Sequence, residues 1–199
     1  MKGVILILVL ILLSFLSLFY YQLTDSRQLK ISGQEDVNIV FELESIYQEF
    51  ASIYLSKGRY QKAIDLYKKA LNINLNSPRT WYKLGRTYIE LKNYQKAINC
   101  YRQVLEIDPG SIIVLNDLGW IYEVIGDYQK SIKYFQKYLK YNPDDPEVYF
   151  KLGIVYLEAK DLPEAKAKLA IAKKLAKKQD RLQLLAKIEE LLKRIGDKS

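Results

Sequence analysis

A 34-residue repeat, present in four successive copies, constrains the fold of this chain more than any other feature of its sequence. The stretch WYKLGRTYIELKNYQKAINCYRQVLEIDP, from Trp81 to Pro109, aligns without a gap with LNDLGWIYEVIGDYQKSIKYFQKYLKYNP, from Leu115 to Pro143. The same 34-residue frame extends in both directions and defines four units, residues 44–77, 78–111, 112–145 and 146–179. Self-similarity at a fixed period of this length is typical of solenoids, in which each unit packs on its neighbours.

Within each unit, apolar residues recur at helical spacing in two runs. In the second unit the runs predict helices over about 79–91 and 94–107, with Lys92-Asn93 as the turn between them. Asp108-Pro109 predicts the end of the second helix, because the residue before a proline disfavours helical dihedral angles.

Gly85 lies in the middle of the first of these helices. Glycine costs about 1 kcal/mol relative to alanine in a helix interior. We therefore expect two helices to approach closely at Gly85, with Ala97 as the small residue that faces it.

The second unit matches the pattern of tetratricopeptide repeats, which runs W-x2-L-G-x2-Y, then A-x3-F, then P. The matching residues are Trp81, Leu84, Gly85, Tyr88, Ala97, Tyr101 and Pro109, with tyrosine in place of phenylalanine. The chain thus resembles the tetratricopeptide repeat (TPR) family over about two thirds of its length, and the fourth unit departs most from the pattern. The resemblance implies an all-α fold, a right-handed α-solenoid of four helix-turn-helix repeats in which most tyrosines pack in the core.

Residues 180–199 follow the last unit and predict a capping helix with a short tail. One face of the stretch 180–195 carries Leu182, Leu185, Ile188, Leu191, Leu192 and Ile195, and Gly196 is a plausible stop. Repeat arrays need such a solvating cap. A coiled-coil dimerisation helix is the alternative, but the stretch is short for one.

In TPR proteins the first helix of each unit lines a concave face that binds an extended peptide or a partner helix. The residues of this chain expected in that partner-binding groove are Arg79, Tyr82, Lys83, Arg86, Ile113, Asn116, Trp120, Phe150 and Ile154. Trp120 occupies a groove position and would anchor a partner, whereas Trp81 occupies the consensus core position. Packing of Trp120 against the next repeat is the alternative.

Three basic residues, Arg79, Lys83 and Arg86, lie about one turn apart on one predicted helix. They could grip a carboxylate or an acidic peptide, or they could form a solvated helix face. Some TPR proteins hold the C-terminal carboxylate of chaperones in a clamp of lysine and asparagine. The first unit offers Gln48 and Ser52 where half of this clamp should be, so we do not expect that activity.

The N-terminal residues 1–23 predict a transmembrane anchor, because no residue from Gly3 to Thr24 is charged. A helix of that length spans the roughly 30 Å hydrocarbon core of a bilayer, here through residues 4–23. A cleaved signal peptide and a buried core helix are the alternatives. Residues 24–43 are predicted to form a linker. Positive charges flank both sides of the segment almost equally, and we expect the repeat domain on the extracytoplasmic side.

Composition argues against catalysis. The chain has no histidine, which removes the commonest general base and metal ligand, and it contains no glycine-rich phosphate loop. We therefore expect no enzyme activity, no cofactor and no metal site. The net charge of +8 suits an acidic partner or an anionic membrane surface. The lysine-rich stretch 166–181 could contact anionic lipid head groups or nucleic acid. Its lysines are spread around a helix and lack interleaved aromatic residues, so we interpret it as a solvated face and expect no nucleic acid as partner.

These observations predict a membrane-anchored TPR scaffold, that is, a single-pass membrane protein. We expect it to bind a protein or peptide ligand through its groove, and the basic residues there would suit an acidic ligand. One alternative is an assembly factor for a larger membrane complex, such as a photosystem, which the chain resembles in architecture. Another is a structural protein that associates with itself through the ends of the array.

Overall fold

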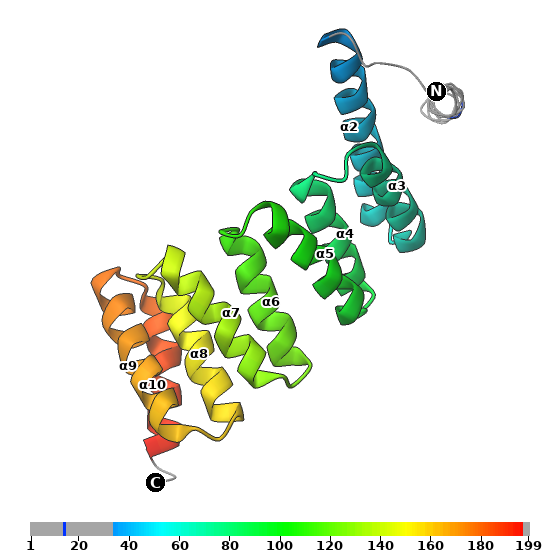
Figure 1. Cartoon of the computed structure of the whole chain (residues 1–199). Coiled ribbons are helices and arrows are strands. Elements are labelled where there is room, and N and C mark those ends of the chain that lie inside the picture. The colour runs from blue at the N-terminus through cyan, green and yellow to red at the C-terminus, as the bar shows by residue number, and fades with distance from the viewer. Residues whose placement is uncertain (1–13, 15–33, 197–199) are drawn as a thin grey trace. The chain divides into compact units, whose positions relative to one another are not determined.

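Every regular element that the computed structural model describes is an α-helix (Figure 1). The structure describes Ser14 and residues 34–196. Its helices are α2 (Gln34–Ser56), α3 (Tyr60–Ile73), α4 (Pro78–Glu90), α5 (Tyr94–Ile107), α6 (Ile112–Val124), α7 (Tyr128–Tyr141), α8 (Pro146–Glu158), α9 (Leu162–Lys178) and α10 (Leu182–Gly196). The repeats lie in the second of two compact units, Met1–Glu42 and Leu43–Ser199. The all-helical fold predicted from the sequence is confirmed.

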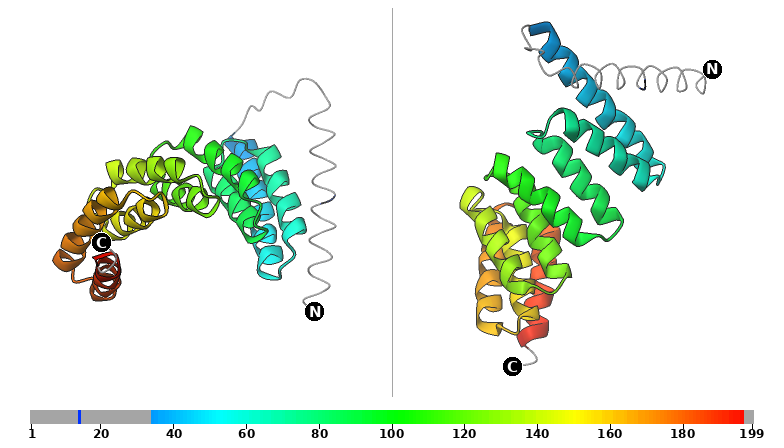
Figure 2. Two further views of the ribbon diagram at one scale, coloured as in Figure 1. Left: turned by 90° about the horizontal axis from the view of Figure 1, so that it is seen from below. Right: turned by 45° about the vertical axis from the view of Figure 1, so that its right-hand side comes forward.

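The helices of the second unit pair as hairpins with the spacing of the repeat. Helices α4, α6 and α8 begin at Pro78, Ile112 and Pro146, which are the first residues of three predicted repeats. Helix α4 packs against α5, α6 against α7 and α8 against α9, and each second helix also contacts the first helix of the next hairpin. Within this unit the hairpins follow one another in a row that ends at α10 (Figure 2).

A glycine in each of the first helices α4, α6 and α8 makes room for a large side chain of the second helix. A Cβ atom built on Gly85 would lie 2.5 Å from Cε1 of Tyr101, and one on Gly119 would lie 2.6 Å from Cε1 of Phe135. The close approach expected at Gly85 is therefore present. In the next hairpin the residue equivalent to Ala97, Ser131, also lies at the glycine, because its hydroxyl donates a hydrogen bond of 2.8 Å to the backbone oxygen of Gly119. The helices approach closely because the ring of Tyr101 packs directly over the glycine, and Ala97 is buried beside this contact.

The turn inside each hairpin has one repeated backbone conformation. Gly58, Lys92, Gly126 and Lys160, spaced 34 residues apart, all have positive φ values, of 68°, 54°, 80° and 62°. In three hairpins the residue after this position caps the second helix. The side chains of Asn93, Asp127 and Asp161 accept a hydrogen bond from the backbone N–H three residues further on.

The connections between hairpins end one helix and begin the next. Helix α5 ends at Ile107, as the Asp108-Pro109 pair predicts. Before α8, the side chain of Asp145 accepts hydrogen bonds from the N–H groups of Glu147 and Val148, and the Tyr138 hydroxyl donates to it over 2.6 Å. Backbone groups at the start of α8 are thus satisfied by a side chain that also fixes α7.

The aromatic residues of the repeat pattern pack in the core. Tyr88 and Tyr101 are 7% and 0% exposed. Trp81 is half-buried, and its indole N–H donates a hydrogen bond of 2.8 Å to the backbone oxygen of Leu75. The consensus tryptophan therefore packs on its own connection as well as on the core.

Helix α10 covers the C-terminal end of the array. Ile188 is fully buried and packs with Leu169, Ala172 and Ala176 of α9. Leu182, which the sequence pattern places on the same apolar face, is 72% exposed at the first turn of α10. Helix α10 thus caps the array with most of its apolar side chains buried or partly buried, and Leu182 is the exception.

The N-terminal predictions fall largely outside the described residues. The expected membrane segment, residues 1–23, and residues 24–33 of the expected linker lie there. The rest of residues 24–43 is helical, because α2 begins at Gln34 and continues into the first repeat. No helix in the described part of the chain is both long and apolar enough to cross a membrane.

Candidate functional site

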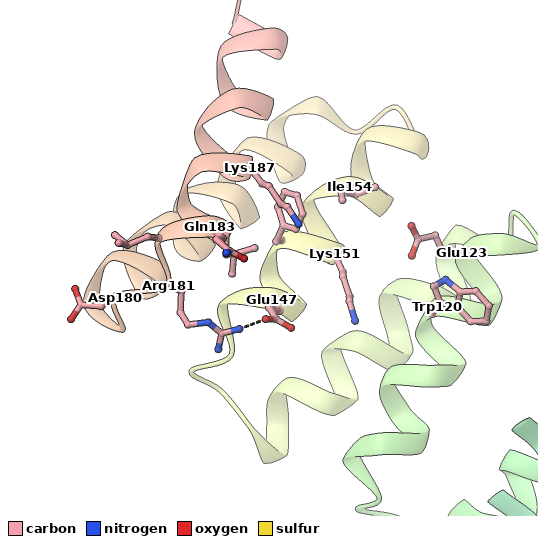
Figure 3. Close-up of a pocket in the computed structure, with 12 residues that line it drawn as sticks. Trp120, Glu123, Glu147, Lys151, Ile154, Asp180, Arg181, Gln183 and Lys187 are labelled. Carbon is pink, nitrogen blue, oxygen red and sulfur yellow. Dashed lines mark hydrogen bonds and ion pairs between the residues drawn. The ribbon is translucent and has the colours of Figure 1, made fainter. Parts of the chain in front are cut away.

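A groove of about 810 Å³ lies between α6, α8 and α10 (Figure 3). Its apolar lining comes from Trp120 of α6, Phe150 and Ile154 of α8, and Leu184 of α10. Charged side chains from the same helices surround this lining. The combination of apolar side chains with a polar surround is the usual anatomy of a site that binds another protein.

Trp120 is the large aromatic residue of this groove. It follows Gly119 on α6, so its side chain leaves the helix on a different side from the packing contact with Phe135. Its side chain is 38% exposed, and its ring meets Tyr94 of the preceding hairpin edge-on at 6.2 Å between centroids. Trp120 is thus held on one side by a neighbouring repeat and open to the groove on the other.

The charged groups of the groove differ in how fully they are paired. Arg181 forms an ion pair with Glu147 (Figure 3), and Lys151 donates a hydrogen bond of 2.8 Å to Oδ1 of Asn116. Glu123 is half-buried. Burial, and then the nearby Glu158 carboxylate, raise the pKa of Glu123, while Lys151 partly opposes them.

The basic residues of α4 form a second group. Arg79 and Arg86 are exposed, and Lys83 is half-buried with its Nζ 3.4 Å from Oγ of Ser52. Burial, followed by the charge of Arg79, lowers the pKa of Lys83. Arg79 and Lys83 therefore repel each other, and an anion bound there would relieve this repulsion.

Arg86 is also tied to the aromatic residues beside it. Although burial opposes it, the nearby Tyr82 hydroxyl helps to raise the pKa of Arg86, and the Tyr82 ring stacks on that of Tyr101 at 5.6 Å between centroids. The Tyr101 hydroxyl in turn donates to Oδ2 of Asp117 over 3.1 Å. Helices α4, α5 and α6 thus hold the guanidinium of Arg86 close to the hydroxyl groups of two tyrosines.

The structure brings together only part of the predicted groove set. Trp120, Phe150 and Ile154 line the groove between α6, α8 and α10, and Asn116 reaches it through Lys151. Ile113 is 58% exposed on the first turn of α6 and does not line this groove. The α4 residues also lie outside it: Arg79, Tyr82, Lys83 and Arg86.

The first repeat contributes a structural contact at a position expected to be open. Gln48 is buried, and its side-chain amide donates 2.8 Å hydrogen bonds to both Glu44 and Thr80. It therefore ties α2 to α4 and is not free to bind a partner.

Sequence reasoning missed the contribution of α10 to the groove. Arg181, Leu184 and Lys187 line it, although residues 180–199 were expected to be only a cap. A signal was available, because the 34-residue frame extends from Pro146 to Asp180. Arg181 and Leu184 then fall on the second and fifth positions of a further unit, which are groove positions in the other repeats.

The remaining chemistry-bearing side chains give no sign of a reactive centre. The described residues contain no group of three or more Cys, Asp or Glu side chains placed to hold a metal ion. Cys100 is buried, and burial raises its pKa to about 12, so the thiol is protonated at neutral pH.

Comparisons with known proteins agree with this geometry. One model of the tetratricopeptide repeat family matches residues 42–110 and 76–144, and another matches residues 126–188. No curated protein matches the sequence.

Among solved structures, the chain is similar to a crystal structure of MamA. The TM-score is 0.64 and the sequence identity 20%, over 69% of this chain and 81% of that chain. It is also similar to MamA, residues 41 to the end, from Desulfovibrio magneticus RS-1. That match has a TM-score of 0.61 and 18% identity, over 76% of this chain and 96% of the other. At such identities the similarity concerns the fold.

Proposed function

The chain belongs to the tetratricopeptide repeat family, and we propose that it is a scaffold that binds a segment of a partner protein in the groove between α6, α8 and α10. Repeats of this family generally bind proteins and do not catalyse reactions. The function proposed here is accordingly recognition, with no chemical step.

The exposure of Trp120 beside an apolar lining is the observation that carries the proposal. Tryptophan, tyrosine and arginine dominate binding energy where they sit in largely desolvated pockets. The Trp120 ring is held by Tyr94 before any partner arrives, so little conformational freedom is lost on binding. Phe150, Ile154 and Leu184 would then cover the apolar side chains of the partner.

The basic group on α4 extends the proposed interface toward acidic partners. Arg79, Lys83 and Arg86 form no ion pair with any residue that the structure describes. We propose that carboxylates of a longer bound segment contact these side chains. Such contacts at the edge of an interface mainly raise the association rate and make it sensitive to salt.

We further propose that residues 4–23 anchor the scaffold in a membrane as a single span, with the repeats on the extracytoplasmic side. The uncharged sequence from Gly3 to Thr24 supports this proposal. Alkaline extraction of membranes tests the anchor, because an integral protein stays in the pellet. Protease added to sealed vesicles tests the side on which the repeats lie.

The groove is tested with a photocrosslinking residue at Gln183, which lines it, in the full chain expressed in its own membranes. The substitution Trp120→Ala should lower the yield of crosslinked partner, with an affinity loss of roughly thirtyfold for a hot-spot residue. Leu91→Ala removes a comparably exposed apolar side chain, 45% exposed and outside the groove, and should leave the yield unchanged. Equal yields in both folded variants would contradict the proposal.

A further inference from the structure

Helices α7 and α9 carry a concentration of positive charge that the groove does not use. Helix α7 contains four lysines and no acidic residue, and α9 contains six lysines and one glutamate. The two helices therefore have a formal charge of +9, against +8 for the whole chain, so the rest of the chain is close to neutral overall. The formal charge of these two second helices therefore exceeds the net charge of the whole chain.

The two helices are neighbours within the second unit. Lys133 and Gln136 of α7 line a shallow cavity together with Asp161, the N-cap residue of α9. In Figure 2, α7 and α9 lie along one side of this unit, and α8 and α10 lie on the other. The lysines of α7 and α9 thus belong to a surface separate from the groove, which we call the basic face.

Several lysines of these helices already have partners. Lys130 pairs with Asp127, Lys168 with Glu164, and Lys173 with Glu189. Lys137 lies over the ring of Tyr134. The other six lysines form neither an ion pair nor a cation–π contact with any described residue, and these define the basic face: Lys133, Lys140, Lys166, Lys174, Lys177 and Lys178.

An ordinary solvated helix face does not account for this pattern. Solvated helices commonly alternate charges of both signs, which stabilise the helix as pairs four residues apart. Lys174 and Lys178 are instead like charges at that spacing, and so are Lys133 and Lys137. The helix dipole favours Lys177 and Lys178 in the last turn of α9, but it does not favour Lys133 or Lys174.

We propose that the basic face docks on the surface of a membrane that contains anionic phospholipids. Lysine is a compact point charge that suits a diffuse anionic surface, and juxtamembrane lysines gain affinity from such lipids. Ile171 of α9 is 39% exposed and would add an apolar contact with the lipid interface.

Nucleic acid fits the same face less well. Helices α7 and α9 contain no arginine, which is the residue that most often makes two-pronged contacts with phosphates and bases. Tyr141 is the one large exposed aromatic residue on these two helices, whereas single-stranded nucleic acids bind over several stacked aromatics. Binding to nucleic acid is therefore kept as an outcome that would overturn the proposal.

A fluorescent reporter can be attached to the basic face at one chosen position. Its single native cysteine, Cys100, is buried and protonated, so it does not react with a thiol dye in the folded protein. An environment-sensitive fluorophore can then be attached at Ile171→Cys, and a control fluorophore at Leu91→Cys. The labelled full chain is reconstituted in vesicles of phosphatidylcholine, with or without phosphatidylglycerol.

The proposal predicts a blue shift at position 171 with phosphatidylglycerol present, no shift in phosphatidylcholine alone, and no shift at position 91. Salt near 1 M should reverse the shift, because it shortens the Debye length to about 3 Å. Each lysine near an anionic surface contributes about fivefold, so Lys133→Gln, Lys174→Gln and Lys178→Gln together should lower the docking constant roughly a hundredfold.

A control variant removes three lysine charges that lie outside the basic face. Lys57→Gln, Lys68→Gln and Lys92→Gln replace three exposed lysines of the first two repeats and should leave docking unchanged. Equal loss in the two triple variants would show a general charge effect and overturn the proposal. A reporter that is silent on phosphatidylglycerol vesicles, or that responds only to added RNA, would also overturn it. Thermal unfolding of each variant establishes that the repeats remain folded.

Discussion

At the scale of single residues, a missing Cβ sets the distance between the helices of three hairpins. Gly85, Gly119 and Gly153 each lie where a Cβ atom would come within 2.5–2.7 Å of Tyr101, Phe135 or Leu169. The sequence identified the close approach, because glycine in a helix interior is unfavourable without a packing reason. It did not identify Tyr101 as the side chain that packs over Gly85, because this partner depends on how the two helices cross.

We expect Gly119→Ala to lower the free energy of unfolding by about 1–3 kcal/mol. The added methyl group would overlap the ring of Phe135, and such overpacking typically costs this much. Urea denaturation measures the change. Gly196→Ala is the matched control, because a Cβ there meets no atom within 4 Å. A Gly119→Ala protein as stable as the control would mean that the ring moves aside freely.

A second residue-scale prediction concerns the hairpin turns. Lys92 has a φ of 54° at the position where Gly126 has 80°, and a residue with a Cβ is strained in this left-handed region. Lys92→Gly should therefore raise the free energy of unfolding by up to about 1 kcal/mol, while Gly126→Ala should lower it by about as much. Chemical denaturation of both variants is the measurement, and changes of the same sign would contradict the explanation.

At the scale of elements, a buried carboxylate joins α2 to α4. Glu44 is 5% exposed, and it accepts hydrogen bonds from Gln48, Asn74 and Thr80. Burial alone would raise the pKa of Glu44, but the hydrogen bonds outweigh it and leave this pKa below its ordinary value. Because the folded pKa lies below the unfolded one, Glu44 stabilises the fold above the unfolded pKa, and this contribution is lost as the pH falls through the folded pKa.

We expect Glu44→Gln to destabilise the protein by about 1–3 kcal/mol at neutral pH. The amide would place a donor against the donors of Asn74 or Gln48, in a site with little access to water. The variant should also lose part of the decline in stability that the parent shows below about pH 4.5, near the unfolded pKa of a glutamate. Denaturation at a series of pH values measures both effects. Glu90→Gln, on the exposed side of α4, should leave the profile unchanged.

The helices themselves could be predicted well from the sequence, and their junctions less well. The spacing of apolar residues located the turn at Lys92-Asn93, and the Asp108-Pro109 pair located the end of α5, because these signals act locally. The start of α2 at Gln34 was missed, since residues 34–43 carry scattered charge and no repeat pattern. The buried role of Gln48 was missed because its partners, Glu44 and Thr80, come from two different repeats.

At the scale of the whole molecule, the core of the described repeats is a succession of local clusters. One cluster runs from Ala51 to Tyr122, a second from Leu115 to Val155, and a third joins α9 and α10 around Ile188. Each hairpin therefore depends mainly on its neighbours, as in other repeat arrays. The sequence did not assign α10 to the groove, because α10 has Ala186, Lys187 and Glu190 at the positions where α4, α6 and α8 have leucine, glycine and tyrosine.

This local dependence leads to a prediction about how the array comes apart. Ile188→Ala should cost about 2–4 kcal/mol, because a fully buried side chain would leave a cavity against Leu169, Ala172 and Ala176. In a nearest-neighbour array, the loss should fall on α9 and α10, whose amide hydrogens would exchange faster, while α4 and α5 keep their protection. Hydrogen exchange measured by mass spectrometry resolves the two regions. Leu182→Ala, on the same helix but 72% exposed, should change neither region. Uniform loss of protection through all repeats would instead mean that the chain unfolds as a single cooperative unit, and that α10 stabilises helices it does not touch.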